Sequence, residues 1–219
     1  MTPRLVVAAL ALLFAAAPAR AAGEDAGAPP AREELSPEKV EALLADVTRA
    51  RAKLTSLRSS FTQERKLALL ATTVKSTGAL AYAAPDRLRW ELLAPDDVVY
   101  WVGPEGLSYR TKSSRATVPS AGANVARALA DVRAMLTGDV KALSTRYALT
   151  AARGASDVEL RGTARDPKAT SVRAFTLVLD KDLVRPVRAR LLEGKSDTID
   201  LVFTNVQLDV PVDPAQMRP

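Results

Sequence analysis

Three short runs of residues have types and spacings that occur in enzyme sites. The first, Ser36-Pro37-Glu38-Lys39, has the serine–lysine spacing of penicillin-recognising enzymes, in which the lysine helps to activate a serine at a helix N-terminus. The companion S-D-N and K-T-G motifs are missing, because the nearest run, Lys75-Ser76-Thr77-Gly78, has one residue too many. A serine N-cap followed by proline at the first helical position explains the same residues without chemistry.

The other two runs are better explained as turns. Gly194-Lys195-Ser196 is similar to the end of a phosphate-binding loop, but Ala189 stands where that loop requires glycine. Asp96 and Asp97 offer a carboxylate pair of the kind that glycosidases use, yet adjacent residues of a strand point to opposite faces. We therefore interpret both runs as turn residues.

The composition excludes whole classes of site. The chain has no histidine and no cysteine, which excludes Ser-His-Asp and Cys-His nucleophilic catalysis and removes the usual zinc, copper and haem ligands. We assign no catalytic residue, no metal site and no cofactor, and we expect a binding protein rather than an enzyme. An enzyme built on scattered carboxylates stays open as an alternative.

The N-terminus has the pattern of an export signal. Arg4 precedes an apolar run over residues 5–17, and Ala19 and Ala21 are the small residues that a signal peptidase reads. The run is shorter than the roughly 20 residues that a membrane-spanning helix needs. We therefore predict that residues 1–21 are a signal peptide, cleaved near Ala21, and that the protein is periplasmic.

The rest of the chain divides into a short linker and one domain. Residues 22–35 are rich in glycine, proline, alanine and glutamate and predict a flexible linker, whereas residues 36–219 are long enough for a single domain without disulfides. Loss of the signal peptide lowers the formal charge from +6 to +4. No basic cluster is interleaved with aromatic residues, so we expect no nucleic acid partner. We expect a monomer.

Hydrophobic periodicity predicts two main helices and many strands. Apolar residues recur at helical spacing from Val40 to Leu54, and again from Val125 to Leu136 before a terminating Gly138. Charged and large apolar residues alternate strictly over residues 87–92, which is typical of a strand with one wet and one dry face. The predicted fold is mainly β with a helical lid (α+β). A curled antiparallel sheet of about 10–11 strands forms an incomplete barrel, covered on its concave side by two or three helices.

Several strand motifs follow one another in order. An S-F-x-Q-like run follows the first helix, then come a G-x-L-x-Y run, a P-x-x-x-x-W run and a glycine hairpin. Their residues are Leu57-Arg58-Ser59-Ser60-Phe61-Thr62-Gln63, Gly78-Ala79-Leu80-Ala81-Tyr82, Pro85-Asp86-Arg87-Leu88-Arg89-Trp90-Glu91 and Gly103-Pro104-Glu105-Gly106-Leu107-Ser108-Tyr109. This ordered set resembles the outer-membrane lipoprotein carrier family, LolA.

The resemblance implies a shuttle with an apolar cavity under a helical lid. Such a carrier takes acylated lipoproteins from an ATP-driven inner-membrane transporter and delivers them to an outer-membrane receptor. The family usually has arginine immediately before the strand-opening proline, where it holds the lid shut, but here Ala84 precedes Pro85. Either another residue closes the lid, with Arg87 and Arg89 as the candidates, or the lid is looser than in the family. A carrier of another lipid or glycolipid, or a lipid-responsive sensor, stays open as an alternative.

The candidate ligand-binding residues are the apolar side chains expected on the dry face of the sheet and on the facing side of the lid. They are Phe61, Leu80, Tyr82, Leu88, Trp90, Trp101, Leu129, Val132, Leu136, Phe175 and Leu177.

We expect the exported protein to begin at Ala22, because Ala19 and Ala21 satisfy the small-residue rule of signal peptidase. Mass spectrometry of the protein purified from the periplasm measures this N-terminus. Recovery of a chain that keeps residues 1–21 would contradict the prediction.

Overall fold

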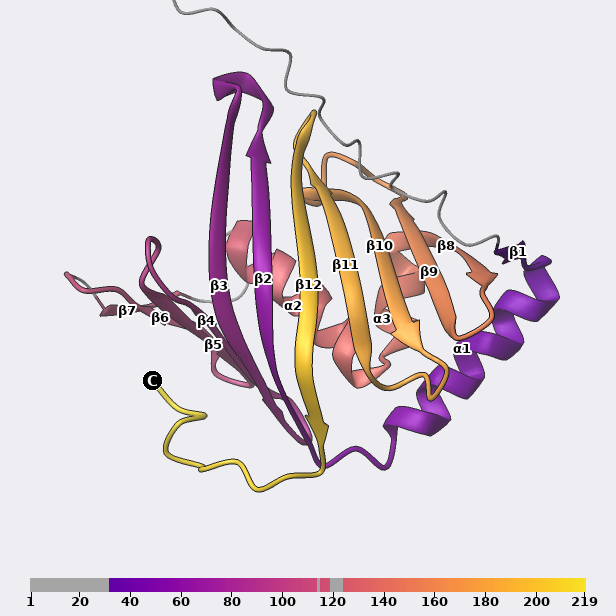
Figure 1. Cartoon of the computed structure of the whole chain (residues 1–219), viewed down its shortest axis with the longest axis horizontal. Coiled ribbons are helices and arrows are strands. Elements are labelled where there is room, and N and C mark those ends of the chain that lie inside the picture. Colours follow the sequence, from indigo (N-terminus) through magenta and orange to yellow (C-terminus); the bar gives the residue numbers. More distant parts are fainter. Residues whose placement is uncertain (1–31, 114, 119–123) are drawn as a thin grey trace, which may run out of the picture. The chain divides into compact units, whose positions relative to one another are not determined.

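The computed structural model describes residues 32–113, 115–118 and 124–219, and residues 31–219 form one compact unit (Figure 1). The predicted signal peptide lies outside the described residues. The folded unit starts before the predicted boundary at residue 36, because strand β1 (Glu33–Glu34) pairs with β8 (Tyr147–Arg153). The Leu35 amide also donates to the Ala151 carbonyl at 3.0 Å. The end of the predicted linker therefore belongs to the sheet.

One antiparallel sheet of twelve strands and three helices make up the described part of the chain. Apart from the two-residue β1, this agrees with the predicted 10–11 strands, and the predicted fold class is confirmed. The helices are α1 (Pro37–Arg51), α2 (Asn124–Thr137) and α3 (Val140–Arg146). The remaining strands are β2 (Ser56–Leu67), β3 (Thr72–Ala83), β4 (Arg87–Leu92), β5 (Val98–Gly103), β6 (Gly106–Arg110), β7 (Arg115–Val118), β9 (Asp157–Ala164), β10 (Val172–Asp180), β11 (Pro186–Glu193) and β12 (Asp197–Leu208), with a 3₁₀ turn, η1 (Ala68–Leu70), between β2 and β3.

The strand order joins two meanders at the middle of the sheet. From edge to edge it runs β1-β8-β9-β10-β11-β12-β2-β3-β4-β5-β6-β7. The last strand, β12, pairs with β2 from Leu208 opposite Leu57 to Thr198 opposite Lys66. Among the described residues the edge strands β1 and β7 do not pair with each other, so the barrel is incomplete.

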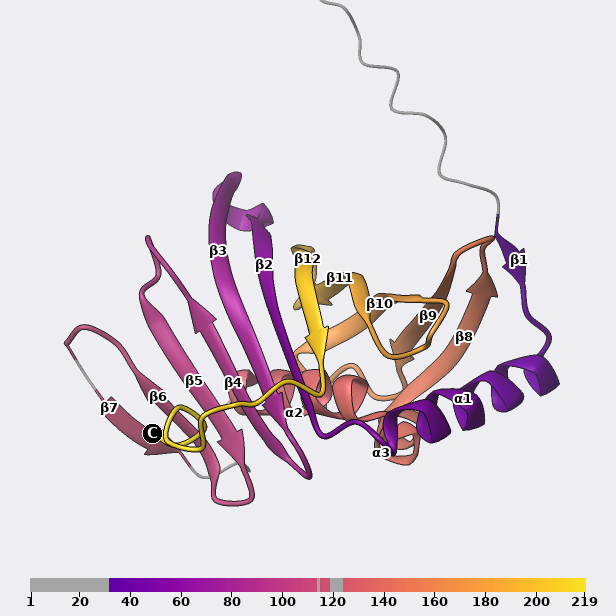
Figure 2. The ribbon, with the colours of Figure 1, turned by 60° about the horizontal axis from the view of Figure 1, so that its bottom comes forward.

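The helices lie over one face of the sheet. The chain leaves β7 at one edge and re-enters at β8, which is next to the other edge, so α2 and α3 must cross the sheet between them. In Figure 1 both helices lie behind the strands, and Figure 2 shows the strands curving around them. We call this side the inner face and the opposite side the outer face. No helix in the described ranges has the length and apolar character that crossing a membrane requires.

Local sequence signals account for the ends of these elements. Helix α1 starts with Pro37 at its first position after Ser36, whose side chain makes no capping hydrogen bond. Gly138 ends α2 with φ +70°, a conformation that favours glycine. Gly194, with φ +52°, sits in the β11–β12 turn, and Asp96 and Asp97 lie in the β4–β5 connection. The interpretation of both runs as turns is confirmed.

Two aromatic rings lie directly over strand glycines in the core. An added Cβ at Gly162 would come within 2.2 Å of the Phe175 ring. At Gly78 it would come within 2.3 Å of the Phe61 ring and 2.2 Å of the Glu91 carbonyl oxygen. These glycines leave room for the large side chains of the neighbouring strands, so the core depends on both members of each pair.

We expect Gly78→Ala to lower the free energy of unfolding by about 1–3 kcal/mol, because the methyl group displaces both a core ring and a backbone carbonyl. Urea unfolding followed by circular dichroism measures the change. Ala79→Ser on the adjacent, partly exposed position of the same strand is the control. A Gly78→Ala protein as stable as the control would contradict the role of the glycine.

Candidate functional site

A continuous apolar surface covers the inner face of β2 to β4. In antiparallel pairs, directly opposite residues have side chains on the same face. Leu80 lies opposite Trp90, and Tyr82 lies opposite Leu88. Phe61 packs against Trp90 with ring centroids 4.4 Å apart. These five predicted residues are buried in one cluster, as the alternation over residues 87–92 predicts.

The other predicted residues on this face come from the second half of the sheet and from the lid. Phe175 and Leu177 of β10 are buried in a second cluster with the apolar residues Val40 and Leu43 of α1. Val132 of α2 is partly buried and packs against the first cluster. Leu129 and Leu136 are also α2 positions, but their side chains lie outside the described residues. The structure thus brings most of the predicted lining together on one face.

Trp101 does not share this face, so that part of the prediction is wrong. It lies opposite Arg89 in the β4–β5 pair, whereas Trp90 lies opposite Tyr100. On the outer face the Trp101 indole N–H donates to the Gln216 carbonyl at 2.8 Å, and the Arg110 guanidinium lies 5.4 Å from the ring centre. Strand β5 is apolar at nearly every position, so its sequence did not indicate which residues point inward.

The same surface includes large residues that the sequence analysis did not assign to the site. Phe203 of β12 lies edge-on to Phe61, with centroids 6.2 Å apart, and the register places it directly opposite Phe61. The alternation of Ile199, Leu201 and Phe203 was the signal for it. The cluster also contains Leu57, Val102 and Leu107.

The inner face becomes polar toward the hairpin end of β2 and β3. Gln63 and Ser76 are opposite each other and both are buried. The Ser76 hydroxyl donates to the Asp96 carboxylate, and a guanidinium nitrogen of Arg65 lies 3.8 Å from the same carboxylate. This polar rim of Gln63, Arg65, Ser76 and Asp96 adjoins the apolar surface, so the face suits a ligand that has an apolar part and a polar part.

A buried arginine joins the lid to the sheet. Arg51, at the end of α1, is 3% exposed and donates from its guanidinium to the Leu183 and Val184 carbonyls, each at 3.0 Å. Gly138, between α2 and α3, lies so close that a Cβ would come within 2.9 Å of the Arg51 side chain. Burial lowers the pKa of Arg51 to about 10, so the guanidinium is charged at neutral pH. Arg51 therefore connects the end of α1, next to the junction of α2 and α3, to the β10–β11 turn.

The arginines predicted to close the lid have other partners. Arg87 pairs with Glu105 and Arg89 pairs with Glu91, each at 2.8 Å, and the register places both arginines on the outer face. The prediction that one of them holds the lid is therefore wrong. Arg133 of α2 instead approaches the β3–β4 turn, 3.5 Å from the Asp86 carbonyl.

A second polar anchor holds α2 against α3 and β8. The Tyr147 hydroxyl donates to the Asp131 carboxylate at 2.6 Å, and Arg146 donates to the same carboxylate. Burial, followed by the hydrogen bond to Asp131, raises the pKa of Tyr147 above its ordinary value. Both Asp131 and Tyr147 are buried. Sequence patterns carried no signal for these buried polar contacts, because the partners are distant in the chain or on different elements.

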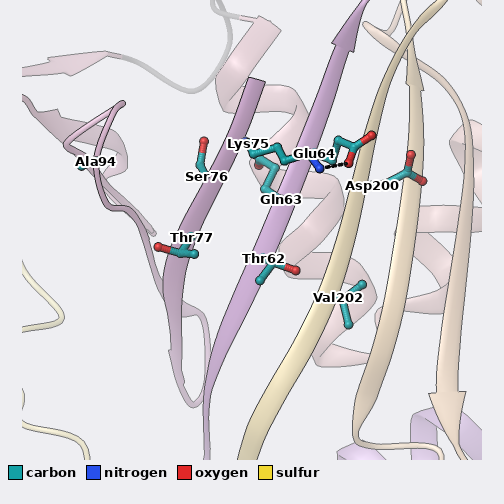
Figure 3. A pocket seen from close by; sticks show the side chains of 9 residues that line it. All are labelled: Thr62, Gln63, Glu64, Lys75, Ser76, Thr77, Ala94, Asp200 and Val202. Carbon is teal, nitrogen blue, oxygen red and sulfur yellow. Dashed lines mark ion pairs between the residues drawn. The ribbon is translucent and has the colours of Figure 1, made fainter. Parts of the chain in front are cut away.

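One hollow among the described residues lies apart from the apolar cluster of the inner face. Its volume is about 520 Å³, and residues of β2, β3 and β12, with Ala94 of the β4–β5 connection, line it (Figure 3). Polar and charged side chains dominate its lining, including an ion pair between Lys75 and Glu64 at 3.5 Å. The lining residues are Thr62, Gln63, Glu64, Lys75, Ser76, Thr77, Ala94, Asp200 and Val202.

Comparison with known proteins assigns the family. The model of the family described as "Outer membrane lipoprotein carrier protein LolA" matches residues 52–218. The chain belongs to the LolA family. Members of this family are periplasmic carriers, not enzymes. No curated protein matches the chain.

Solved structures with a similar fold include a LolA superfamily protein, a putative lipoprotein-sorting protein domain and the MucA/MucB complex. A LolA superfamily protein of Nitrosomonas europaea is 9% identical over 82% of this chain and 97% of that chain, with a TM-score of 0.44. A putative outer membrane lipoprotein-sorting protein domain of Vibrio parahaemolyticus is 11% identical over 80% and 94%, with a TM-score of 0.47. The Pseudomonas aeruginosa MucA/MucB complex matches at 18% identity over 83% of this chain and 61% of that chain, with a TM-score of 0.47. At these TM-scores, the family assignment rests on the sequence match.

We expect Arg51→Ala to lower the free energy of unfolding by about 2–3 kcal/mol, because it leaves two buried carbonyls without a donor. Hydrogen exchange should also rise in α1 and α2 relative to the β-strands. Chemical unfolding and exchange mass spectrometry measure the two effects. Arg49→Ala, an exposed arginine of the same helix that pairs with Asp46, is the control and should change neither. Equal behaviour of the two variants would contradict the anchoring role of Arg51.

Proposed function

We propose that this chain is a periplasmic carrier that binds the acyl chains of lipoproteins on its inner face and shuttles them from the inner to the outer membrane. The proposal implies an inner-membrane releasing transporter and an outer-membrane receptor as partners. The observation that carries it is the membership of the LolA family together with a large apolar face under a helical lid. Phe61, Leu80, Leu88 and Trp90 form the centre of the proposed binding surface.

The energetics of acyl chains support a surface of this kind. Burying a methylene group contributes ~0.8 kcal/mol, so three acyl chains with about forty methylenes represent about 30 kcal/mol of exposure to water. A carrier must cover most of that surface and still release it. The inner-face residues are already packed against the lid, so a ligand replaces apolar contacts with other apolar contacts. This exchange offsets most of the cost of displacing the helices.

The attachment of the lid supports the same proposal. Helix α2 meets the sheet through apolar side chains such as Val132, and through polar contacts at Arg133 and Asp131. Apolar packing without fixed geometry allows ligands of different length, as a carrier of many lipoproteins requires. Of the polar anchors, the bond from Arg133 to the Asp86 carbonyl is long, at 3.5 Å, and is the weak point of the lid.

The test is release of radiolabelled triacylated lipoprotein from spheroplasts by the purified protein. We expect the wild type to extract a soluble one-to-one complex, because the inner face shields the acyl chains. Leu88→Glu and Val132→Glu should reduce release by about tenfold or more, since each introduces a charge into the proposed surface, one from the sheet and one from the lid. Size-exclusion chromatography and scintillation counting measure the yield.

Val202→Glu is the matched control. Val202 is an apolar residue on the outer face and is 43% exposed, so the same substitution there should leave release unchanged. Circular dichroism confirms that each variant is folded before its yield is compared. If folded wild type releases no lipoprotein, the shuttle proposal is wrong, and native mass spectrometry of the purified protein then identifies whether a smaller lipid or glycolipid is bound.

A further inference from the structure

The hairpin that joins β2 and β3 ends in an apolar tip. Residues 67–71 are leucine and alanine only. Leu69 is 95% exposed, whereas the next most exposed large apolar residues among the side chains that the structure describes, Leu93 and Val202, are 47% and 43% exposed. Isolated exposed leucines are common on protein surfaces, but this leucine lies at the end of a projecting arm within a run that has no polar side chain.

The arm extends beyond its neighbours on the β4 side. Strands β2 and β3 pair without interruption from Ser56 opposite Ala83 to Leu67 opposite Thr72. Strand β4 pairs with β3 only from Gly78 to Ala83. The last rungs of the hairpin therefore rise past β4 and β5, as Figures 1 and 2 show.

The tip is held in place rather than loosely attached. The Ala68 amide donates to the Asp197 carboxylate of β12 at 2.9 Å, and the Ala71 amide donates to the Ala68 carbonyl at 3.2 Å. Ala71 has φ +49°, a conformation that alanine rarely adopts. These contacts satisfy two backbone amides of the turn, which lowers the desolvation cost when the Leu69 side chain enters a low-dielectric medium.

We propose that this tip inserts into the surface of a phospholipid bilayer, with Leu69 as the inserted side chain. A bilayer fits the shape of the feature better than a protein partner does, because the tip is a convex, single-turn projection and requires no matching pocket. Lys66 and Lys75 flank it with exposed ammonium groups, 3.4 Å and 3.5 Å from Glu64. Long basic side chains of this kind extend toward lipid headgroups while their stems cover apolar surface.

The placement of the tip links the bilayer to the inner face. Strand β2 carries Phe61 in the apolar cluster, Gln63 and Arg65 at the polar rim, and then the tip. At about 3.3 Å per residue, β2 runs about 20 Å from Phe61 to Leu67, the residue that begins the tip. One leucine gives weak, reversible binding, which suits a protein that must leave the membrane again.

Site-specific fluorescence tests the insertion. The chain has no cysteine, so Leu69→Cys labelled with an environment-sensitive fluorophore reports from the tip alone, and labelled Val202→Cys reports from the outer face of the sheet. Protein-free vesicles of phosphatidylethanolamine and phosphatidylglycerol are the probe. We expect the emission of the label at position 69 to shift to the blue and at least double in intensity, with no change at position 202. Equal responses at both positions, or none at position 69, would overturn the proposal.

Vesicle cosedimentation of the unlabelled protein supplies a second readout. Leu69→Glu should lower the vesicle-bound fraction about tenfold, because one buried leucine contributes about that factor to partitioning. Leu93→Glu, an exposed leucine in the β4–β5 connection, should leave it unchanged. The label at position 69 also provides a test against a protein partner. If its emission shifts to the blue with native membranes but not with protein-free vesicles, the proposal is overturned in favour of a protein partner. Neither assay contains lipoprotein, so failure of the carrier function would not affect them.

Discussion

The crossing from β7 to β8 is the constraint on which the rest of this structure depends. Because β7 is one edge of the sheet and β8 is next to the other, the segment between them must traverse the inner face. Helices α2 and α3 are that segment, so the lid is part of the path of the chain rather than an appended element. Opening it cannot remove it from the sheet. The lid can only shift, with both of its ends attached to strands.

This arrangement gives the apolar inner face two roles. Phe61, Leu88 and Trp90 belong to the hydrophobic core of the described unit, and they are also the surface that the proposed ligand contacts. Stability and binding therefore depend on the same side chains. The buried polar contacts lie elsewhere: Arg51 is at the end of α1, and Asp131, in the middle of α2, accepts from Tyr147 at the start of β8. These contacts hold the helices against the sheet, and Val132, next to Asp131, packs against the apolar cluster.

Local sequence patterns predicted the strand faces and helix ends that depend on neighbouring residues. The strict alternation over residues 87–92 identified Leu88 and Trp90 as inward-facing, and Gly138 marked the end of α2 correctly. The same pattern could not assign the faces of strand β5, because Val99 and Trp101 on its outer face are buried as well. Trp101 is covered there by the C-terminal segment, a contact between residues 115 positions apart. Lid closure was also assigned to the wrong arginines, since the partners of Arg51 lie more than 130 positions away.

The pairing of β12 with β2 has a consequence for how the chain folds. The segments of the N-terminal meander are close together in the chain, whereas β12 is about 130 residues from β2, so one edge of β2 stays without a partner until β12 joins it. Contacts between such distant segments form late and slow the folding of β-proteins. An unpaired edge of twelve residues is also a template for aggregation. To avoid aggregation, either a chaperone must cover this edge or β12 must pair with it quickly.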